Sequence, residues 1–89
     1  MPHLLHIKFP ISLQEFSLVA RILNFKDELY REFHDHAGVE ILDPDAIDIA
    51  LAPLTIKIRS KRFLAAATKL IEKASVNGGL QDTIIITRT

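Results

Sequence analysis

Apolar and polar residues alternate over residues 3–9, near the start of the chain. Leu5, Ile7 and Phe9 fall on one side of this segment. A period of two residues predicts a β-strand with one apolar face. Pro10 marks the end of the predicted strand, because proline has no N–H to donate to a sheet.

The next segment changes to a helical period of three or four residues. Ser12 and Glu15 have the spacing of a capping box, in which both side chains accept hydrogen bonds from backbone N–H groups at a helix start. The apolar stripe that follows contains Leu18, Ile22, Phe25, Leu29 and Phe33. We therefore predict a helix that ends at Gly38, either continuous or broken near Asn24.

Residues 39–53 have two interpretations after a short predicted strand at 39–42. Residues 44–52 fit a strand, because their apolar side chains occupy every second position. They also fit a short helix, because Asp43 and Pro44 are typical of a helix start. We favour the strand and keep the helix as the alternative.

The second half of the chain again has the order strand, helix, strand. Residues 54–59 alternate strictly between apolar and polar. Ser60 is placed to cap a helix with an apolar stripe over 63–74, and the run Asn77-Gly78-Gly79 ends it. Residues 83–88 contain three consecutive isoleucines between threonines, which predicts a strand buried on both faces.

The order of these elements predicts the fold class. Strand–helix–strand–strand–helix–strand is the ferredoxin-like βαββαβ pattern, an α+β fold with both helices on one face of a mainly antiparallel four-stranded sheet. If residues 44–52 are helical, a small three-layer α/β domain is the alternative. We expect one domain over residues 1–89, because one core serves a chain of this length.

The composition excludes several classes of function but does not identify one. Eleven basic and eleven acidic residues give no net charge, but the acidic groups dominate 39–53 and the basic groups dominate 54–89. The absence of cysteine excludes disulfides, thiolate metal sites and thiol catalysis. The N-terminus lacks a signal-peptide pattern, and no apolar run is long enough for a bilayer, so we expect a cytoplasmic protein that does not contact membranes.

Pro2 is a candidate catalytic residue if Met1 is removed, because its secondary amine can act as a general base near neutral pH. The start Met-Pro-His, followed by a strand, resembles the tautomerase superfamily, whose small enzymes are built of paired βαβ units. The resemblance implies that Pro2 shuttles a proton on an enol or keto acid, with Arg59 or Arg62 holding the carboxylate. A retained Met1 would block this amine, and proline is also tolerated at the first residue of a strand.

Two further groups are candidate ligand sites. Arg59, Ser60, Lys61 and Arg62 join a strand to a helix start, where cations and free N–H groups can bind phosphate, carboxylate or an acidic peptide. His34 and His36 flank Asp35 and are weak candidates for a metal site, because residues two apart on a helix point in different directions. Histidines in the last turn also suit the negative end of the helix dipole. We expect no metal and no cofactor.

The face of the sheet opposite the helices carries no aromatic residue in this interpretation. Its predicted members are His6, Lys8, Thr55, Lys57 and Arg59. RNA-binding modules of this architecture stack bases on aromatic side chains, so we do not expect nucleic-acid binding. A second copy of the chain is an alternative occupant of this face.

The chain contains no catalytic triad pattern, paired-carboxylate motif, zinc-protease motif or glycine-rich loop. We therefore expect a non-catalytic interaction or regulatory domain that self-associates, with a dimer favoured, since a core this small benefits from association. An acidic protein or a small anionic ligand is a possible partner. The tautomerase-like enzyme and the anion-binding module are the two alternatives.

Overall fold

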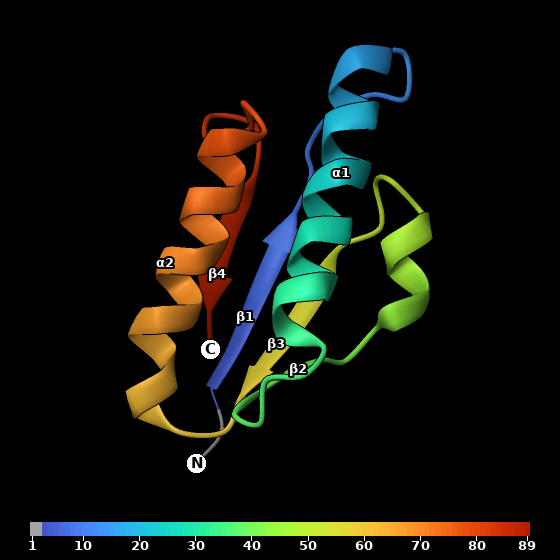
Figure 1. Cartoon of the computed structure of the whole chain (residues 1–89). Coiled ribbons are helices and arrows are strands. Elements are labelled where there is room, and N and C mark those ends of the chain that lie inside the picture. The colour runs from blue at the N-terminus through green and yellow to red at the C-terminus, as the bar shows by residue number, and fades with distance from the viewer. Residues whose placement is uncertain (1–2) are drawn as a thin grey trace.

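The computed structural model describes residues 3–89 and consists of helices packed on a four-stranded sheet (Figure 1). In chain order the elements are β1 (His3–Lys8), α1 (Phe16–Phe33), β2 (Val39–Ile41), the 3₁₀ helix η1 (Pro44–Asp48), β3 (Leu54–Ile58), α2 (Lys61–Asn77) and β4 (Ile85–Arg88). The strands lie in the order β2-β3-β1-β4, and all neighbouring pairs are antiparallel.

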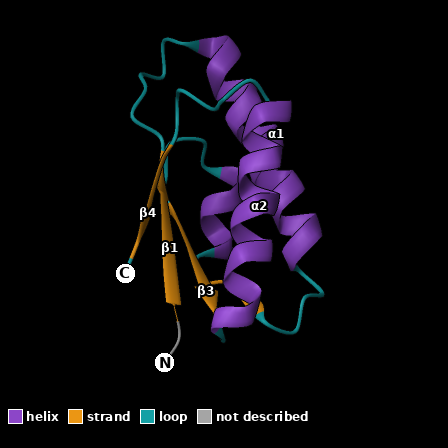
Figure 2. Ribbon diagram, turned by 90° about the vertical axis from the view of Figure 1, so that its left-hand side faces the viewer, coloured by secondary structure: helices purple, strands orange, loops and turns teal. Residues whose placement is uncertain are grey.

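This arrangement confirms the predicted ferredoxin-like α+β fold. The strands β1 and β2, joined through α1, have β3 between them, and β3 and β4, joined through α2, have β1 between them. Such interleaved βαβ units define the fold. Both helices cover the same face of the sheet and leave the opposite face uncovered (Figure 2).

The core lies between the helices and the sheet and follows the two periods of the sequence. The strands contribute Leu5, Ile7, Val39, Leu54, Ile56 and Ile58, and the helices contribute Ile22, Phe25, Leu29, Phe33, Leu64, Ala67, Ile71 and Ala74, all of them buried. Each fully buried side chain of Leu, Ile or Phe stabilises the fold by about 1.5–3 kcal/mol relative to exposure.

Residues 44–52 do not form the strand that we favoured. Pro44–Asp48 is a 3₁₀ helix, with Asp43 at the N-cap and Pro44 in the first turn, so the helical alternative is correct for residues 44–48, while residues 49–52 form bends and turns. The preferred strand is wrong because the carbonyls of Ala46, Ile49 and Ala52 point to one side chain rather than to a neighbouring strand. The 3₁₀ helix lies beside α1, so it adds no third layer (Figure 1).

The helix α1 is shorter than predicted at both ends and is continuous through Asn24. The Ser12 N–H donates to a Glu15 carboxylate oxygen at 3.1 Å, so the predicted capping box exists as a turn that precedes the helix. At the other end, α1 stops at Phe33 instead of continuing to Gly38. Gly38 does not have a positive φ and therefore is not a left-handed C-cap.

The boundaries of α2 agree with the sequence. Ser60 occupies the N-cap position, but its hydroxyl forms no capping hydrogen bond, contrary to the prediction. The chain leaves the helix through Gly79, which has a φ of 70°. The N–H of Leu80 then donates to the carbonyl of Ser75 at 2.7 Å, and Gly79 N–H donates to Val76 at 3.0 Å. These two bonds form a Schellman motif, which explains the glycine at position 79.

The final strand, β4, is less buried than we predicted. We predicted that residues 83–88 are buried on both faces, but β4 is an edge strand that pairs only with β1 among the described residues. Ile85 is 47% exposed. Ile84 and Ile86 are half-buried beneath the helices, so the run of isoleucines covers a sheet edge rather than filling its centre.

Candidate functional site

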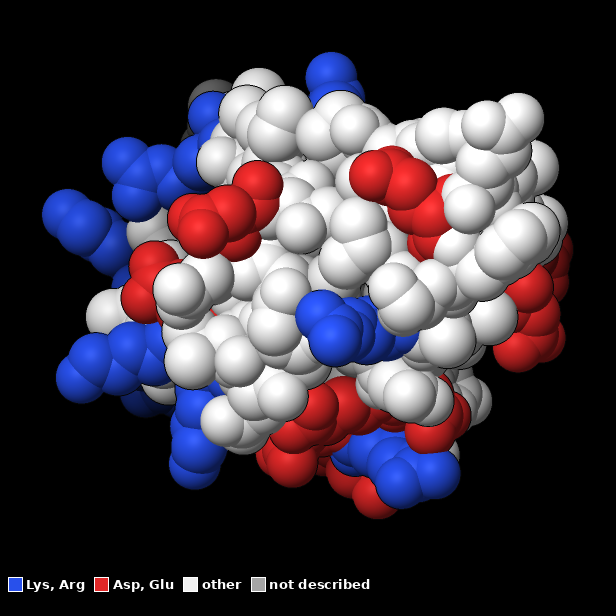
Figure 3. Space-filling view, turned by 90° about the horizontal axis from the view of Figure 1, so that it is seen from above, with Lys and Arg blue, Asp and Glu red and all other residues white. Residues whose placement is uncertain are grey.

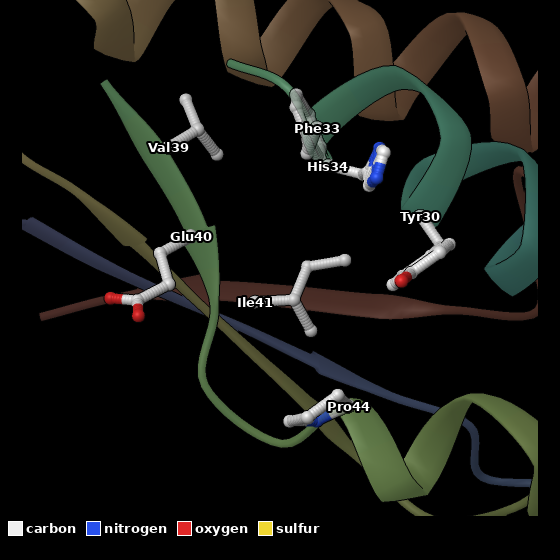
Figure 4. Close-up of a pocket in the computed structure, with 7 residues that line it drawn as sticks. All are labelled: Tyr30, Phe33, His34, Val39, Glu40, Ile41 and Pro44. Carbon is white, nitrogen blue, oxygen red and sulfur yellow. The ribbon is translucent and has the colours of Figure 1, made fainter. Parts of the chain in front are cut away.

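A groove lies between the C-terminal half of α1, the edge strand β2 and η1 (Figure 4). It contains a cavity of about 180 Å³, lined by Tyr30, Phe33, His34, Val39, Glu40, Ile41 and Pro44. The Glu40 carboxylate points away from the cavity in this view. The cavity therefore has mainly apolar walls, with Tyr30 and His34 as its polar groups. A neighbouring hollow of about 290 Å³ continues past Tyr30 and Pro44 to Asp27 and Asp48.

The strand β2 presents a free backbone edge to this groove. The Arg59 N–H donates to the Gly38 carbonyl at 2.9 Å, and the Leu42 N–H donates to the Thr55 carbonyl at 2.9 Å. Because bonded residues alternate along an antiparallel ladder, the intervening Val39 and Ile41 turn their backbone groups away from β3. Val39 N–H bonds to His36. The Val39 carbonyl and both polar backbone groups of Ile41 are left facing outward.

Lys26 holds the outer wall of the groove in place. Its side chain is fully buried, and its ammonium donates hydrogen bonds to the carbonyls of Ala46 at 2.8 Å, Ile49 at 2.5 Å and Ala52 at 2.6 Å. The ring of Phe9 lies 4.8 Å from the same nitrogen, within the range of a cation–π contact. One side chain of α1 thus fixes η1 and the turn after it.

Burial lowers the pKa of Lys26 from 10.5 to about 8, because it disfavours the charged form, while the negative charge of Asp43 acts in the opposite direction. Lys26 is not among the candidate functional residues predicted from the sequence. The signal was present, because Lys26 lies four residues after Ile22 and three before Leu29, on the apolar stripe. A lysine at that position must find buried acceptors.

Charge is distributed unevenly around the molecule. The helix α2 carries Lys61, Arg62, Lys69 and Lys73 against Glu72, whereas the segment from β2 through η1 carries Glu40, Asp43, Asp45 and Asp48 and no basic residue. Seen from above, basic side chains dominate the side of α2, and acidic side chains gather on the side of η1 (Figure 3). The groove is therefore on the acidic side of the protein.

The strand β4 forms the other edge of the sheet, opposite the β2 edge that borders the groove. Thr89 and Leu4 exchange two backbone hydrogen bonds, of 3.0 and 3.1 Å. By alternation, Ile86 and Arg88 direct their backbone groups away from β1. Figure 2 looks onto this edge, and no other segment lies in front of β4.

The four residues of the predicted anion site lie where the sequence placed them, at the start of α2. Arg59, Lys61 and Arg62 are exposed, and the Arg62 guanidinium lies 4.8 Å from the centre of the Phe63 ring. The Ser60 hydroxyl oxygen is buried and has no hydrogen-bond partner in residues 3–89. Within residues 3–89, no hydrogen bond or ion pair joins the side chains of these four residues to one another or to a shared partner.

The two candidate metal ligands have separate surroundings. The His36 ring accepts a hydrogen bond from the Gly38 N–H through Nδ1 at 3.2 Å and contacts Phe63 edge-on. The His34 ring lies against Tyr30, with Nδ1 at 3.4 Å from Asp35. Within residues 3–89 no three His, Asp or Glu side chains are grouped as a metal site requires. Pro2, the candidate general base, lies outside the described residues.

The uncovered face of the sheet contains the predicted polar residues. His6 is the partner of Thr55, and Lys57 is the partner of Leu4, so these side chains share one face. By the same alternation, this face also carries Leu42 and Ile85, which are 45% and 47% exposed. The face is therefore more apolar than the sequence analysis assumed.

Comparison with known proteins assigns no family. Neither a protein-family model nor a curated protein matches this sequence. Among residues 3–89, neither helix has the length and apolar character needed to cross a bilayer.

Proposed function

We propose that this protein is a non-catalytic interaction domain that forms a homodimer through the β4 edge. In this dimer the two β4 strands pair antiparallel about a two-fold axis and join both sheets into one. An exposed strand edge with unpaired backbone groups is a template for such pairing. The observation that carries the proposal is the self-complementary sequence of this edge.

Residues 82–88 read Asp-Thr-Ile-Ile-Ile-Thr-Arg, which is symmetric about Ile85 except for the opposite charges at its ends. An antiparallel pair centred on Ile85 places Ile85 opposite its own copy and Ile84 opposite Ile86. It also places Thr83 opposite Thr87 and Asp82 opposite Arg88 of the second copy. Every position therefore meets a residue of matching chemistry, and cross-strand pairs of these kinds each contribute about 0.2–1 kcal/mol.

The backbone alternation agrees with this register. Ile86 and Arg88 direct their N–H and C=O groups away from β1, and in the register centred on Ile85 their partners are Ile84 and Asp82 of the second copy. Residues 81–83 form a turn before β4 in the single chain, so the pair of Arg88 with Asp82 requires this turn to become extended in the dimer. The Ile84 N–H donates to Leu80 at 3.2 Å, but that carbonyl already accepts a 2.8 Å bond from Thr83. The Ile84 N–H is thus available for a new partner at small cost.

The other edge of the sheet is less suited to self-pairing. An antiparallel pair of two β2 strands, centred on that short strand, would place Glu40 opposite Glu40 of the second copy. Like charges directly opposite each other destabilise a strand pair. The two edges therefore differ in chemistry, and the β4 edge is the one that favours a second copy.

Replacement of Ile85 by lysine tests this proposal. The side chain is 47% exposed in the single chain, so Ile85→Lys changes the stability of the monomer little, but it places two ammonium groups against each other at the two-fold axis. We expect the wild-type protein to sediment as a dimer at high micromolar concentration and the variant to sediment as a monomer.

Ile49→Lys is the matched control, because Ile49 is 59% exposed at the end of η1, which lies on the β2 side of the sheet, away from the β4 edge (Figure 1). It is expected to remain dimeric. A monomeric wild-type protein, or an Ile85→Lys variant that dimerises as strongly as the wild type, would exclude the β4 interface.

A further inference from the structure

We infer that the groove at the β2 edge binds an extended peptide segment of a partner protein, in which an apolar residue and a lysine or arginine are two positions apart. This binding site goes beyond the proposed dimer and lies on the opposite edge of the sheet. The peptide adds to β2 as a fifth strand, places its apolar side chain in the cavity and directs its basic side chain toward η1.

The backbone supplies the first part of the recognition. The N–H and C=O groups of Ile41 and the C=O of Val39 face outward from the sheet, beside the cavity that both side chains line. Added strands obtain their affinity from such main-chain groups and their specificity from pockets for alternate side chains. The side chains of Val39 and Ile41 lie on the helix side of the sheet, so a neighbouring residue on that side of the peptide enters the groove.

The size of the cavity favours a side chain over a free small molecule. Its volume of about 180 Å³ is below the roughly 300–1,000 Å³ that is typical of small-molecule sites. Phe33, Ile41 and Pro44 provide apolar walls. A branched aliphatic side chain such as leucine suits this space.

The charges near the groove favour a basic residue at the second position. The hollow that continues from the cavity is lined by Asp27 and Asp48, and no lysine or arginine lines either space. Asp27 forms an ion pair with Arg31 at 2.8 Å, so Asp48 is the more available carboxylate of the two. Residues two apart in a strand are about 6.8 Å apart on the same face, which suits two hollows that share Tyr30 and Pro44.

The wall that carries Asp48 is held in place before any ligand arrives. The three hydrogen bonds from Lys26 hold the carbonyls on both sides of Asp48, at Ala46 and Ile49, and that of Ala52. A site that is already ordered loses less conformational entropy on binding. Lys26 is therefore a positioning residue for this groove and does not contact the peptide itself.

The experiment uses the full chain labelled with ¹⁵N and two peptides, acetyl-Thr-Leu-Thr-Lys-Thr-amide and the reversed acetyl-Thr-Lys-Thr-Leu-Thr-amide. A peptide can pair with β2 in the parallel or the antiparallel direction, and the two orders place leucine at the cavity and lysine near η1 in one direction each. We expect one of the two to shift the amide signals of Val39 and Ile41 and to slow the hydrogen exchange of the Ile41 N–H. We expect peptides with serine in place of leucine, or glutamate in place of lysine, to bind at least about threefold more weakly.

Asp48→Lys tests the charge at the second position. It is expected to weaken the leucine–lysine peptide about three- to tenfold and to strengthen the glutamate peptide, whereas Glu72→Lys on α2 leaves both unchanged. The Ile85→Lys variant should bind as the wild type does, so a failure of the dimer and a failure of this site are separable.

Three results would overturn the inference. One is the absence of any shift at Val39 and Ile41 with either peptide at millimolar concentration. Another is binding without protection of the Ile41 N–H, which would indicate a small apolar ligand site instead of strand addition. The third is equal affinity for the lysine and glutamate peptides.

Discussion

The ring of Phe63 occupies the space beside Gly38 in which any other residue would place its Cβ atom. A Cβ built on Gly38 would overlap the Cδ2, Cε2 and Cγ atoms of that ring. The contact joins the chain just before β2 to the first turn of α2, next to the hydrogen bond from the Arg59 N–H to the Gly38 carbonyl. Gly38 is required here for close approach, not for an unusual backbone conformation.

Gly38→Ala is therefore expected to lower the free energy of unfolding by about 1–3 kcal/mol, because overpacking forces the Phe63 ring or the backbone to move. Urea denaturation measures the change. Gly78→Ala is the matched control, since a Cβ there makes only ordinary contacts of 3.4 Å or more, and it should change stability little. Adding Phe63→Leu to Gly38→Ala should recover part of the loss. Unchanged stability in the Gly38→Ala variant would show that this close approach is not constraining.

The buried ammonium of Lys26 makes stability depend on pH in an unusual direction. Its pKa is lowered to about 8 in the folded protein, against 10.5 for the exposed group. Between these values the folded protein has lost the proton and the unfolded chain still holds it. The unfolded state then binds more protons, so the free energy of unfolding rises with pH over this range, by at most about 3 kcal/mol.

Urea denaturation at about pH 7 and about pH 10 measures this dependence, with Lys26→Met as the reference, because it keeps the length of the side chain and removes the titrating group. Wild-type stability is expected to rise relative to the variant across this interval. A relative fall would mean that the ammonium form is the one that the folded state favours.

The elements and the core were predictable because they depend on local periodicity. The alternation in β1 and β3 and the stripe of α1 each identify their buried side chains without knowledge of the fold. The order of the elements then indicates the ferredoxin-like arrangement. The paired glycines 78 and 79 also predicted the end of α2 correctly.

The errors occurred where tertiary contacts decide the structure. Residues 44–52 alternate like a strand, but Pro44 lacks an N–H and the carbonyls that follow are held by Lys26, a residue 20 positions away from the nearest of them. The three isoleucines of residues 84–86 are apolar enough for a central strand, yet the topology places them at an edge.

The candidate sites depended even more on the fold. Alternation predicted which polar residues share the uncovered face of the sheet. The groove could not be predicted, because it joins the end of α1, β2 and η1, and its position requires the correct structure of residues 44–48. The self-complementary order of residues 82–88 is visible in the sequence. It indicates self-pairing only when β4 is an edge strand, and the sequence alone does not show that position.

The most direct test of the proposed dimer is an exchange of charges between Asp82 and Arg88, followed by sedimentation equilibrium. Arg88→Asp alone creates two like-charge pairs across the interface and should weaken the dimer at least about tenfold. Asp82→Arg combined with Arg88→Asp restores opposite charges and should return the dissociation constant to within about threefold of the wild type. If the double variant is as weak as Arg88→Asp alone, or if neither variant differs from the wild type, the two strands do not pair in this register.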